Sequence, residues 1–459
     1  MKYLSTESKY ATSLAASLLL AVIYGYIAYF LVRKEFSLLM ALTALGFFST
    51  YFVIRYSNFA FKQLYGLAII YRLIFIFSIP QLSQDFFRFF WDGQLIINGL
   101  NPYLHNVDHY FTSGNLINSL HQAETLRQGM GELSAGNFSN YPPVSQYLYA
   151  LSAGLARDSV MIFIVALRLL LIGFELIVIY YGKKLLKAFN RDSKAIFLYA
   201  LNPLCIIEIT GNLHLEGVMI SFFVMSIYYL MQKKYLVSGI ILSLSIGTKL
   251  VSLIALPLIV MYLWRRYPLP LRSKSITAFL LGLVFALGVQ FLPFFNVVFL
   301  TNFSESIGLW FGKFEFNASI FYLVRWIGYQ IYGYNIIQSY GVIMPVVVSI
   351  IFLFITLKMK GNLKSILACF MWMLMIYFLF STTVHPWYIL FPLALGVLTN
   401  YKFPILWSFL VFLSYYAYTD TKFMESAIIL TIEHIFLILF CIYELLLKKK
   451  NLISDFFFK

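Results

Sequence analysis

Residues 83–103 have the sequence S-Q-D-F-F-R-F-F-W-D-G-Q-L-I-I-N-G-L-N-P-Y. The segment follows three apolar runs, and it contains two carboxylates, Asp85 and Asp92, and one guanidinium, Arg88. Only 12% of the residues in the chain are charged. A cluster of charges in such a chain is a candidate functional site, because charged groups are energetically costly within a membrane and are rarely found there without a function.

The composition predicts an all-α integral membrane protein. The 459 residues are 61% hydrophobic, with a mean hydropathy of +0.81, and no soluble fold hides that much apolar surface. Apolar runs near the length of a spanning helix, about 20 residues, predict about 14 membrane segments, with an uncertainty of about two. The predicted spans are 11–32, 36–54, 63–80, 159–182, 195–210, 214–231, 275–295, 336–357, 364–381, 387–400, 403–419 and 425–447, with two short helices in 235–264. The first run is too long for a signal-peptide core, so we expect it to be retained.

Basic residues predict the orientation. The net charge is +15, and Lys and Arg gather in short loops at 183–194, 233–234, 265–274, 358–364 and 448–450. This pattern is typical of cytoplasmic loops rather than of nucleic-acid binding. We therefore expect a multi-pass protein of the cytoplasmic membrane with both termini in the cytoplasm. Arg33 and Lys34 then lie outside and are an exception to the rule.

The same orientation places the remaining polar segments on the extracytoplasmic face. These are two long loops, 81–158 and 296–334, and two short turns, 211–216 and 381–387. Neither long loop has the composition of a separate folded domain, so we expect one polytopic membrane domain over 1–459. In 303–333 aromatic residues are mixed with Lys313, Glu315 and Arg325, which predicts helices lying in the membrane interface. The pattern favours one polar site on the outer face.

The first outer loop supplies the candidate base. Asp85 lies just beyond a predicted span, at the water boundary, where the pKa of a carboxyl group can rise toward the range that suits proton removal. The alternative is an interfacial ion pair with Arg88, three residues further along a helix. Asp92 faces elsewhere, so it caps a helix, pairs with a base or binds substrate. Asn101-Pro102-Tyr103 is expected to end the helix, because proline forbids its continuation.

Later turns supply further candidates. The turn Gly211–Gly217 contains Asn212, His214 and Glu216. Contacts to sugar hydroxyls or phosphate are favoured there. One alternative is a metal site, for which the turn offers no third ligand. The other is a hairpin with a purely structural role. Arg168 and Glu175 are seven residues apart in one predicted span, and we interpret them as an internal polar pair.

Four basic or aromatic candidates occur in the second half of the chain. Lys249 interrupts an apolar run, where an ammonium is costly unless it meets an anion or water, so it is a candidate phosphate ligand or a snorkelling lysine. His385 and Trp387 open a late span in the motif H-P-W-Y, either as interface anchors or as contacts for phosphate or sugar hydroxyls. Arg325 is a further phosphate candidate.

These motifs resemble those of one enzyme family. D-F-F-R-F-F-W-D-G, G-L-N-P-Y and the Y-P-P at 141–143 resemble the first outer loop of GT-C glycosyltransferases that use a polyprenyl-phosphate sugar. Bacterial mannosyltransferase-like proteins are the nearer relatives, and the first mannosyltransferase of glycosylphosphatidylinositol synthesis is a more remote one. G-N-L-H-L-E-G, G-T-K and H-P-W-Y are similar to later landmarks of the same family.

The resemblance implies a function. It predicts inverting transfer of a hexose, mannose in the nearer relatives, from a polyprenyl-phosphate donor to a glycan or lipid acceptor outside the membrane. Asp85 is the implied base. The implied substrate-binding residues are Arg88, Asp92, Asn212, His214, Glu216, Lys249, Arg325, His385 and Trp387. Remoter relatives carry an Asp-x-Asp pair where this chain has Ser83 and Asp85, so we expect no metal and no other cofactor.

Two alternatives stay open. One is another transferase or an oligosaccharide ligase of the same fold acting on a lipid-linked substrate. The other is a membrane transporter or flippase. A transporter is expected to show a repeated half with polar groups at the midplane, and the sequence shows no second copy of the break at Lys249.

Overall fold

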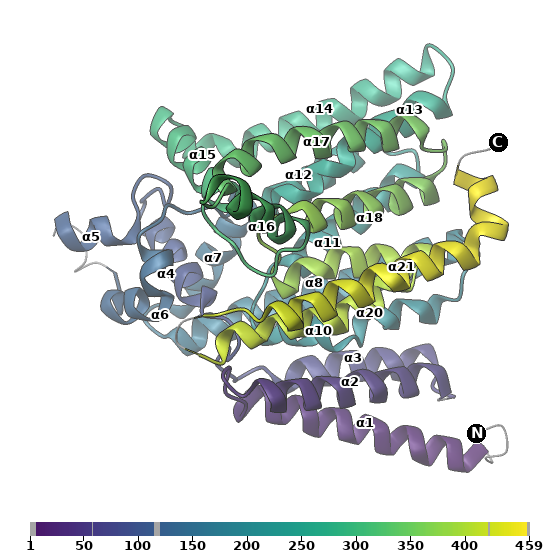
Figure 1. Ribbon diagram of the computed structural model, residues 1–459, viewed down its shortest axis with the longest axis horizontal. Helices are drawn as coiled ribbons and strands as arrows, with labels where there is room; N and C mark the ends of the chain where they lie inside the picture. The colour runs from purple at the N-terminus through teal and green to yellow at the C-terminus, as the bar shows by residue number, and fades with distance from the viewer. Residues whose placement is uncertain (1–5, 57, 114–119, 421–422, 457–459) are drawn as a thin grey trace. The chain divides into compact units, whose positions relative to one another are not determined.

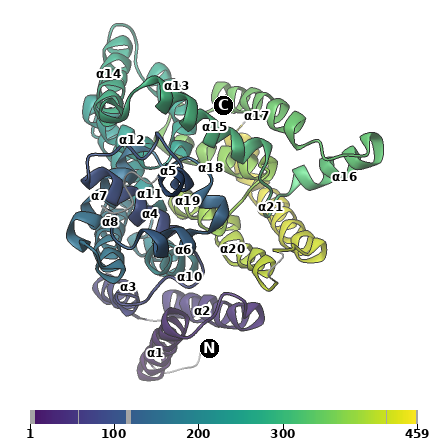
Figure 2. The same ribbon diagram turned by 90° about the vertical axis from the view of Figure 1, so that its left-hand side faces the viewer.

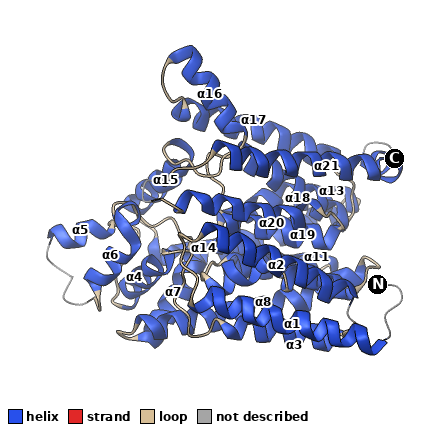
Figure 3. Ribbon diagram, turned by 60° about the horizontal axis from the view of Figure 1, so that its bottom comes forward, coloured by secondary structure: helices blue, strands red, loops and turns tan. Residues whose placement is uncertain are grey.

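The computed structural model describes residues 6–56, 58–113, 120–420 and 423–456. In these residues the regular structure is helical, apart from an isolated β-bridge between Phe316 and Thr383 (Figure 3). The chain divides into two compact units. Unit 1 comprises Met1–Val224 and Tyr418–Lys422, and unit 2 comprises Met225–Ala417 and Phe423–Lys459. The prediction of an all-α protein is confirmed.

Seven helices in the described residues are long and apolar enough to cross a membrane. They are Tyr10–Tyr29, Phe36–Tyr56, Val160–Ala188, Leu271–Phe294, Ile337–Lys358, Leu363–Phe380 and Ala427–Leu447. Many of their large apolar side chains, such as Leu281 and Phe285, are exposed, which suits contact with lipid rather than water. A pair of helices bent by 55°, Ser193–Ala200 and Pro203–Gly211, would make an eighth span. The sequence-based total also counted shorter apolar helices, and that total stays a prediction.

The prediction that both termini lie in the cytoplasm concerns residues 1–5 and 457–459, which lie outside the described residues. It stays a prediction, as do the boundaries of the two long outer loops.

Unit 1 begins with a helical hairpin and a third helix beside it. Its helices are α1 (Thr6–Tyr29), α2 (Phe36–Tyr56), α3 (Phe61–Ile74), α4 (Asp85–Ile97), α5 (Val107–Ser113), α6 (Ala123–Ala135), α7 (Pro143–Ala156), α8 (Val160–Ala188), η2 (Ser193–Ile196), α9 (Phe197–Ala200), α10 (Pro203–Cys205), η3 (Ile206–Gly211) and the first part of α11 (Glu216–Met231). Figures 1 and 2 show α1, α2 and α3 side by side. The predicted third span, 63–80, is shorter than expected, because the helix ends at Ile74.

In the segment predicted as the first outer loop, α6 and α7 pack against α4. Helix α4 ends at Ile97, and Gly99 follows with a φ of +74°. The helix therefore ends before Asn101-Pro102-Tyr103, where the sequence predicted its end. A Cβ atom on Gly93 would lie 2.5 Å from the carbonyl oxygen of Tyr149. The missing side chain therefore lets α4 approach the backbone of α7. That helix was not predicted, although Pro143 at its first turn suits a helix start.

The interpretation of Arg168 and Glu175 as a polar pair is wrong. Glu175 instead pairs with Arg72 of α3, with Nη2 and Oε2 2.7 Å apart. The Arg168 guanidinium donates hydrogen bonds to the backbone carbonyls of Ile76, Ser78, Thr210 and Gly211. The chain bends at these four residues, so their carbonyl groups lack partners within a helix. They accept hydrogen bonds from Arg168, which therefore does not pair with Glu175.

Unit 2 contains the remaining helices. They are α12 (Tyr235–Thr248), η4 (Leu250–Ala255), α13 (Leu256–Arg266), α14 (Leu271–Phe291), η5 (Leu292–Phe294), α15 (Val297–Gly312), α16 (Ile320–Tyr332), α17 (Ile337–Lys358), α18 (Leu363–Phe380), η6 (Pro386–Ile389), α19 (Leu390–Thr399), α20 (Phe403–Leu410), η7 (Val411–Tyr418, whose last residue belongs to unit 1) and α21 (Ala427–Phe456). Lys249 has extended φ and ψ of −149° and 131° between α12 and η4. The predicted break at this lysine is confirmed.

Candidate active site

The centre of the candidate site is a row of three side chains in unit 1. Asp85 is the first residue of α4, and its carboxylate Oδ2 lies 3.6 Å from Nε2 of His214. Nδ1 of the same imidazole lies 3.2 Å from Oε2 of Glu208. The Asp85 side chain is 34% exposed, whereas those of His214 and Glu208 are 2% and 0% exposed. The row therefore runs from a buried carboxylate to one that solvent and substrate can reach.

Local backbone geometry creates this row. Glu208 lies in η3, a π-helical turn, and such turns are frequent at functional sites. The backbone N–H of His214 donates to the carbonyl of Glu208, which folds the turn back on itself. The side chain of Asn212 donates to Glu208 Oε2 at 3.0 Å and accepts from the N–H of Leu82 at 3.4 Å. Asn212 thus connects the turn to the segment that leads into Asp85.

The electrostatics favour a charged imidazole. Burial alone lowers the pKa of His214, but hydrogen bonding and attraction to Asp85 and Glu208 outweigh burial and raise its pKa above the ordinary value. The imidazole lies between the two carboxylates, with Asp85 on its accessible side. This geometry suits a carboxylate that accepts a proton from a substrate.

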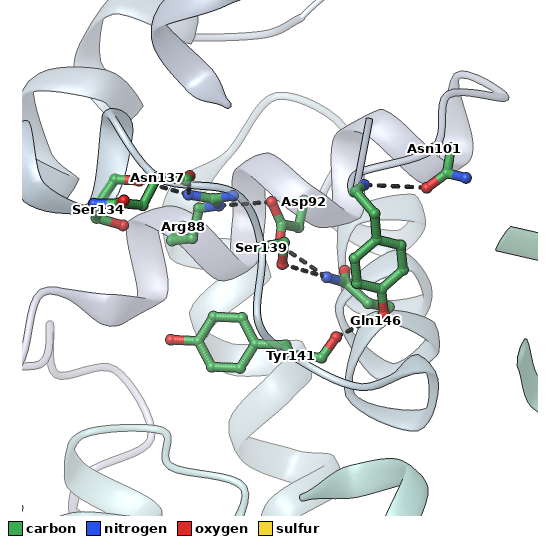
Figure 4. Close-up of polar contacts among 9 residues, drawn as sticks. Arg88, Asp92, Asn101, Ser134, Asn137, Ser139, Tyr141 and Gln146 are labelled. Atoms are coloured by element: carbon green, nitrogen blue, oxygen red, sulfur yellow. Dashed lines mark hydrogen bonds and ion pairs between the residues drawn. The ribbon is translucent and has the colours of Figure 1, made fainter. Parts of the chain in front are cut away.

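Asp92 and Arg88 form a second polar cluster. Nε of Arg88 donates to Oδ1 of Asp92 at 2.8 Å, and both side chains are buried. Ser139 Oγ and Gln146 Nε2 donate to Oδ2 of Asp92 at 2.5 and 2.9 Å, as Figure 4 shows. Of the roles predicted for Asp92, pairing with a basic side chain is confirmed, and that side chain is Arg88.

The same guanidinium holds a loop in place. Nη1 of Arg88 donates to the backbone carbonyls of Ser134 and Asn137, at 2.5 and 3.0 Å (Figure 4). Residues 134–139 are thereby fastened against α4 and α7. The predicted alternative, an ion pair between Arg88 and Asp85, is not the pair that the structure forms.

Glu216 is also placed near this region. It begins α11 and is buried. Together with Asp85 and Asp92, it lies within electrostatic range of the buried Tyr149 hydroxyl. Unit 1 therefore brings together five of the predicted site residues and Asp85 itself.

Unit 2 gathers a smaller aromatic and basic cluster. The imidazole of His385 stacks on Trp387 and Phe316, with ring centroids 4.5 and 4.9 Å apart. Tyr388 packs edge-on against His385 at 5.4 Å, and Nζ of Lys249 lies 5.9 Å from the Tyr388 ring centroid. Lys249 and His385 thus share one aromatic neighbour.

Arg325 has a local counter-ion. It forms an ion pair with Glu315 and lies 4.4 Å over the ring of Tyr322. Asn335 also donates to Glu315, at 2.6 Å. Glu315 therefore balances part of the positive charge of Arg325, which the sequence analysis predicted to bind phosphate.

Comparison with known proteins identifies the family of the chain. Residues 5–265, more than half of the chain, match the family described as alpha-(1→6)-mannopyranosyltransferase, N-terminal domain. The chain belongs to the alpha-(1→6)-mannopyranosyltransferase family. It is also 21% identical over 339 residues to alpha-(1→6)-mannopyranosyltransferase A of Mycobacterium tuberculosis (strain H37Rv), covering 70% of this chain and 62% of that protein. The match thus spans less than two thirds of the length of that relative. The resemblance to bacterial mannosyltransferases is confirmed.

The family match includes Glu208, which sequence reasoning missed. This mannopyranosyltransferase-family chain carries Glu208 in the apolar stretch I-I-E-I-T, inside a predicted span. A lone carboxylate in such a run was the available signal. Its partner, His214, is six residues away and meets it only because the backbone forms a π-helical turn.

Metal binding is the last question about the site. In the described residues, no group of three or more His, Cys, Asp and Glu side chains is arranged to hold a metal ion. The expectation that this member of the mannopyranosyltransferase family needs no metal rests on Ser83 and stays a prediction.

Proposed function

We propose that the protein is a membrane mannosyltransferase that moves mannose from a polyprenyl-phosphate donor to a hydroxyl group of a glycan or lipid acceptor, with inversion at the anomeric carbon. The observation that carries the proposal is the half-exposed Asp85 carboxylate beside the buried His214–Glu208 pair, within the residues that match the mannopyranosyltransferase family.

The proposed reaction is a single displacement. The acceptor oxygen attacks the anomeric carbon while its proton passes to the Asp85 carboxylate. The bond between the anomeric carbon and the phosphate oxygen breaks, and its electron pair leaves with the polyprenyl phosphate. One displacement inverts the configuration, through a transition state with oxocarbenium character.

The His214–Glu208 pair prepares Asp85 for this step. His214, 3.6 Å away, orients one carboxylate oxygen, and Glu208 fixes the ring from its other nitrogen.

No metal is required in this proposal. A lipid monophosphate leaving group carries less charge than a nucleoside diphosphate, so cationic side chains can stabilise it. The phosphate roles predicted for Lys249, Arg325 and His385 remain part of the proposal.

The charge pattern of unit 1 supports an extracytoplasmic site. Arg168 of α8 contacts the turn beside Glu208. Lys183 lies fifteen residues further along the same helix, about 22 Å away at 1.5 Å per residue, and its ammonium lies 4.0 Å over the ring of Phe61. The basic residues that follow Lys183 are of the kind retained in the cytoplasm, so the Asp85 end is the outer one in this proposal.

The test compares transfer from polyprenyl-phosphate mannose and from other polyprenyl-phosphate hexoses, using purified protein in lipid nanodiscs with a lipid-linked glycan acceptor. Asp85→Asn should lower kcat by about 100-fold or more, as loss of a general base does. Asp108→Asn is a matched control, because Asp108 pairs with Arg127 in a partly exposed loop contact. A chelator added to the wild type tests the metal-free mechanism separately.

Three results would contradict the proposal at different levels. Undiminished activity of Asp85→Asn removes the assignment of the base. Transfer only from a diphosphate-linked oligosaccharide would favour a ligase. Movement of the lipid across vesicles without any new glycosidic bond would favour a flippase, and in both cases the proposed transferase class is wrong.

A further inference from the structure

Arg33 is a basic residue that the positive-inside pattern does not explain. It lies in the turn between α1 and α2, where Glu35 accepts a hydrogen bond from the N–H of Val32. The Arg33 guanidinium lies over the ring of Tyr418, with Cζ 3.3 Å from the ring centroid. Its Nε is buried and has no hydrogen-bond acceptor among the described residues. The adjacent Lys34 is exposed.

This pair borders the row of site residues. Tyr418 belongs to unit 1, and the carboxylates of Asp85 and Glu208 both lie within electrostatic range of its hydroxyl. The hydroxyl of Tyr29, at the end of α1, donates to the carbonyl of Ile74 at the end of α3. Figure 1 shows the α1–α2 turn at the same end of unit 1 as the segment that leads into α4.

The charges of the row create a need for such a cation. Asp85 and Glu208 are two carboxylates against one imidazole, so an approaching phosphate meets a site with excess negative charge. An arginine stacked on an aromatic ring keeps its plane fixed and presents its N–H groups at the edge. That edge matches the two oxygens of a phosphate group better than an ammonium does.

We propose that Arg33, held over the ring of Tyr418, binds the phosphate of the lipid-linked donor beside Asp85. This inference rests on the proposed function. The phosphate of the donor is a diester with one negative charge, and it becomes a monoester with up to two when the anomeric C–O bond breaks. The charge that develops on the leaving oxygen is stabilised by the guanidinium, so Arg33 acts on donor binding and on the departure of the phosphate.

A structural role makes a different prediction. If Arg33 serves only to balance Asp85 and Glu208, its loss should destabilise the fold and affect donor and acceptor equally. A phosphate ligand affects the donor alone, and it also affects a sugar-free lipid phosphate that cannot react.

The experiment uses full-length protein in nanodiscs with three variants, Arg33→Gln, Arg33→Lys and the matched control Lys34→Gln. The measurements are kcat, KM for polyprenyl-phosphate mannose, KM for the acceptor, the thermal unfolding midpoint, and direct binding of sugar-free polyprenyl monophosphate. We expect Arg33→Gln to raise the donor KM and to weaken binding of the monophosphate by about tenfold or more, the usual effect of losing a hydrogen bond to a charged group.

The other variants sharpen the assignment. Arg33→Lys should fall between wild type and Arg33→Gln, because it keeps the charge without the planar fork, and Lys34→Gln should match wild type. Tyr418→Leu should weaken monophosphate binding, whereas Tyr418→Phe, which keeps the ring face, should not. These two variants test the arrangement even where Arg33→Gln folds poorly.

Two outcomes overturn the inference. One is binding of polyprenyl monophosphate to Arg33→Gln within twofold of wild type. The other is an equal loss of donor and acceptor affinity with a lower unfolding midpoint, which assigns Arg33 a structural role. If wild type transfers no sugar from any polyprenyl-phosphate hexose, the proposed function fails, while the binding measurement still decides whether Arg33 contacts a lipid phosphate.

Discussion

Replacing Asp92 with asparagine removes the anion that faces a buried guanidinium. Arg88 Nε lies 2.8 Å from Asp92 Oδ1, and the two side chains are 5% and 0% exposed. Ser139 and Gln146 donate to the other oxygen. An asparagine has one acceptor oxygen and one donor group at these positions. It therefore points a donor at another donor whichever way its amide is turned.

The magnitude follows from burial. Breaking a buried ion pair by removing one partner costs about 3–5 kcal/mol, because the remaining charge stays out of water. Arg88 keeps hydrogen bonds to two backbone carbonyls, which places the expected cost near the lower end. The partly exposed pair Arg127–Asp108, with side chains 27% and 33% exposed, should contribute little to stability, because solvent screens its charges.

Thermal unfolding in one detergent at one scan rate is the first assay, since membrane proteins often unfold irreversibly. We expect Asp92→Asn to lower the midpoint clearly and Asp108→Asn to leave it nearly unchanged. Hydrogen exchange is the second assay, and it should show faster exchange in residues 134–139, which the pair fastens to α4.

A double variant separates the pair from the site around it. Arg88→Met combined with Asp92→Leu removes both charges, and it should be less destabilised than Asp92→Asn alone, because no charge is left buried without its partner. The reasoning is refuted if Asp92→Asn costs no more than Asp108→Asn, or if the double variant is worse than the single one.

Two further predictions concern the neighbouring turn and the packing of α4. The pKa of His214 is raised in the folded protein. The stabilisation that its charged form provides should therefore be complete below its ordinary pKa, about 6.5, and should disappear as pH rises through the folded pKa. The difference in unfolding midpoint between wild type and His214→Gln should shrink at higher pH, and a difference that does not depend on pH contradicts this. Gly93→Ala places a Cβ 2.5 Å from the Tyr149 carbonyl oxygen and should cost about 1–3 kcal/mol by overpacking. Gly25→Ala, with nothing within 4 Å, should be neutral or slightly stabilising, and equal midpoints for the two variants would contradict the clash.

Hydropathy and turn residues predicted the helical class and several breaks. The apolar runs are dictated by the thickness of the membrane, which makes them visible without any tertiary information. The break at Lys249 was visible for a local reason too, since glycine, threonine and lysine interrupt the run together. His214 was singled out because polar residues are concentrated in a short turn between apolar helices, and the structure places it between Asp85 and Glu208.

Pairing between side chains was not predictable in the same way. Arg88 has Asp85 three residues before it and Asp92 four residues after it, and helix geometry permits either pair. The choice is made by Ser139 and Gln146, which come from distant parts of the chain and complete the shell around Asp92. Glu208 was missed for a similar reason, since only a π-helical turn brings it to the imidazole.

The two carboxylates of α4 are separated in role by their surroundings. A general base needs access to its substrate and a lone pair that is not already committed to strong donors. Asp92 accepts three hydrogen bonds, one from a guanidinium, in a site closed to solvent. Asp85 is partly exposed and lies 3.6 Å from an imidazole. The buried carboxylate therefore holds the helix and its loop in place, and the accessible one is the base in the proposed reaction, although both come from the same short and strongly aromatic segment.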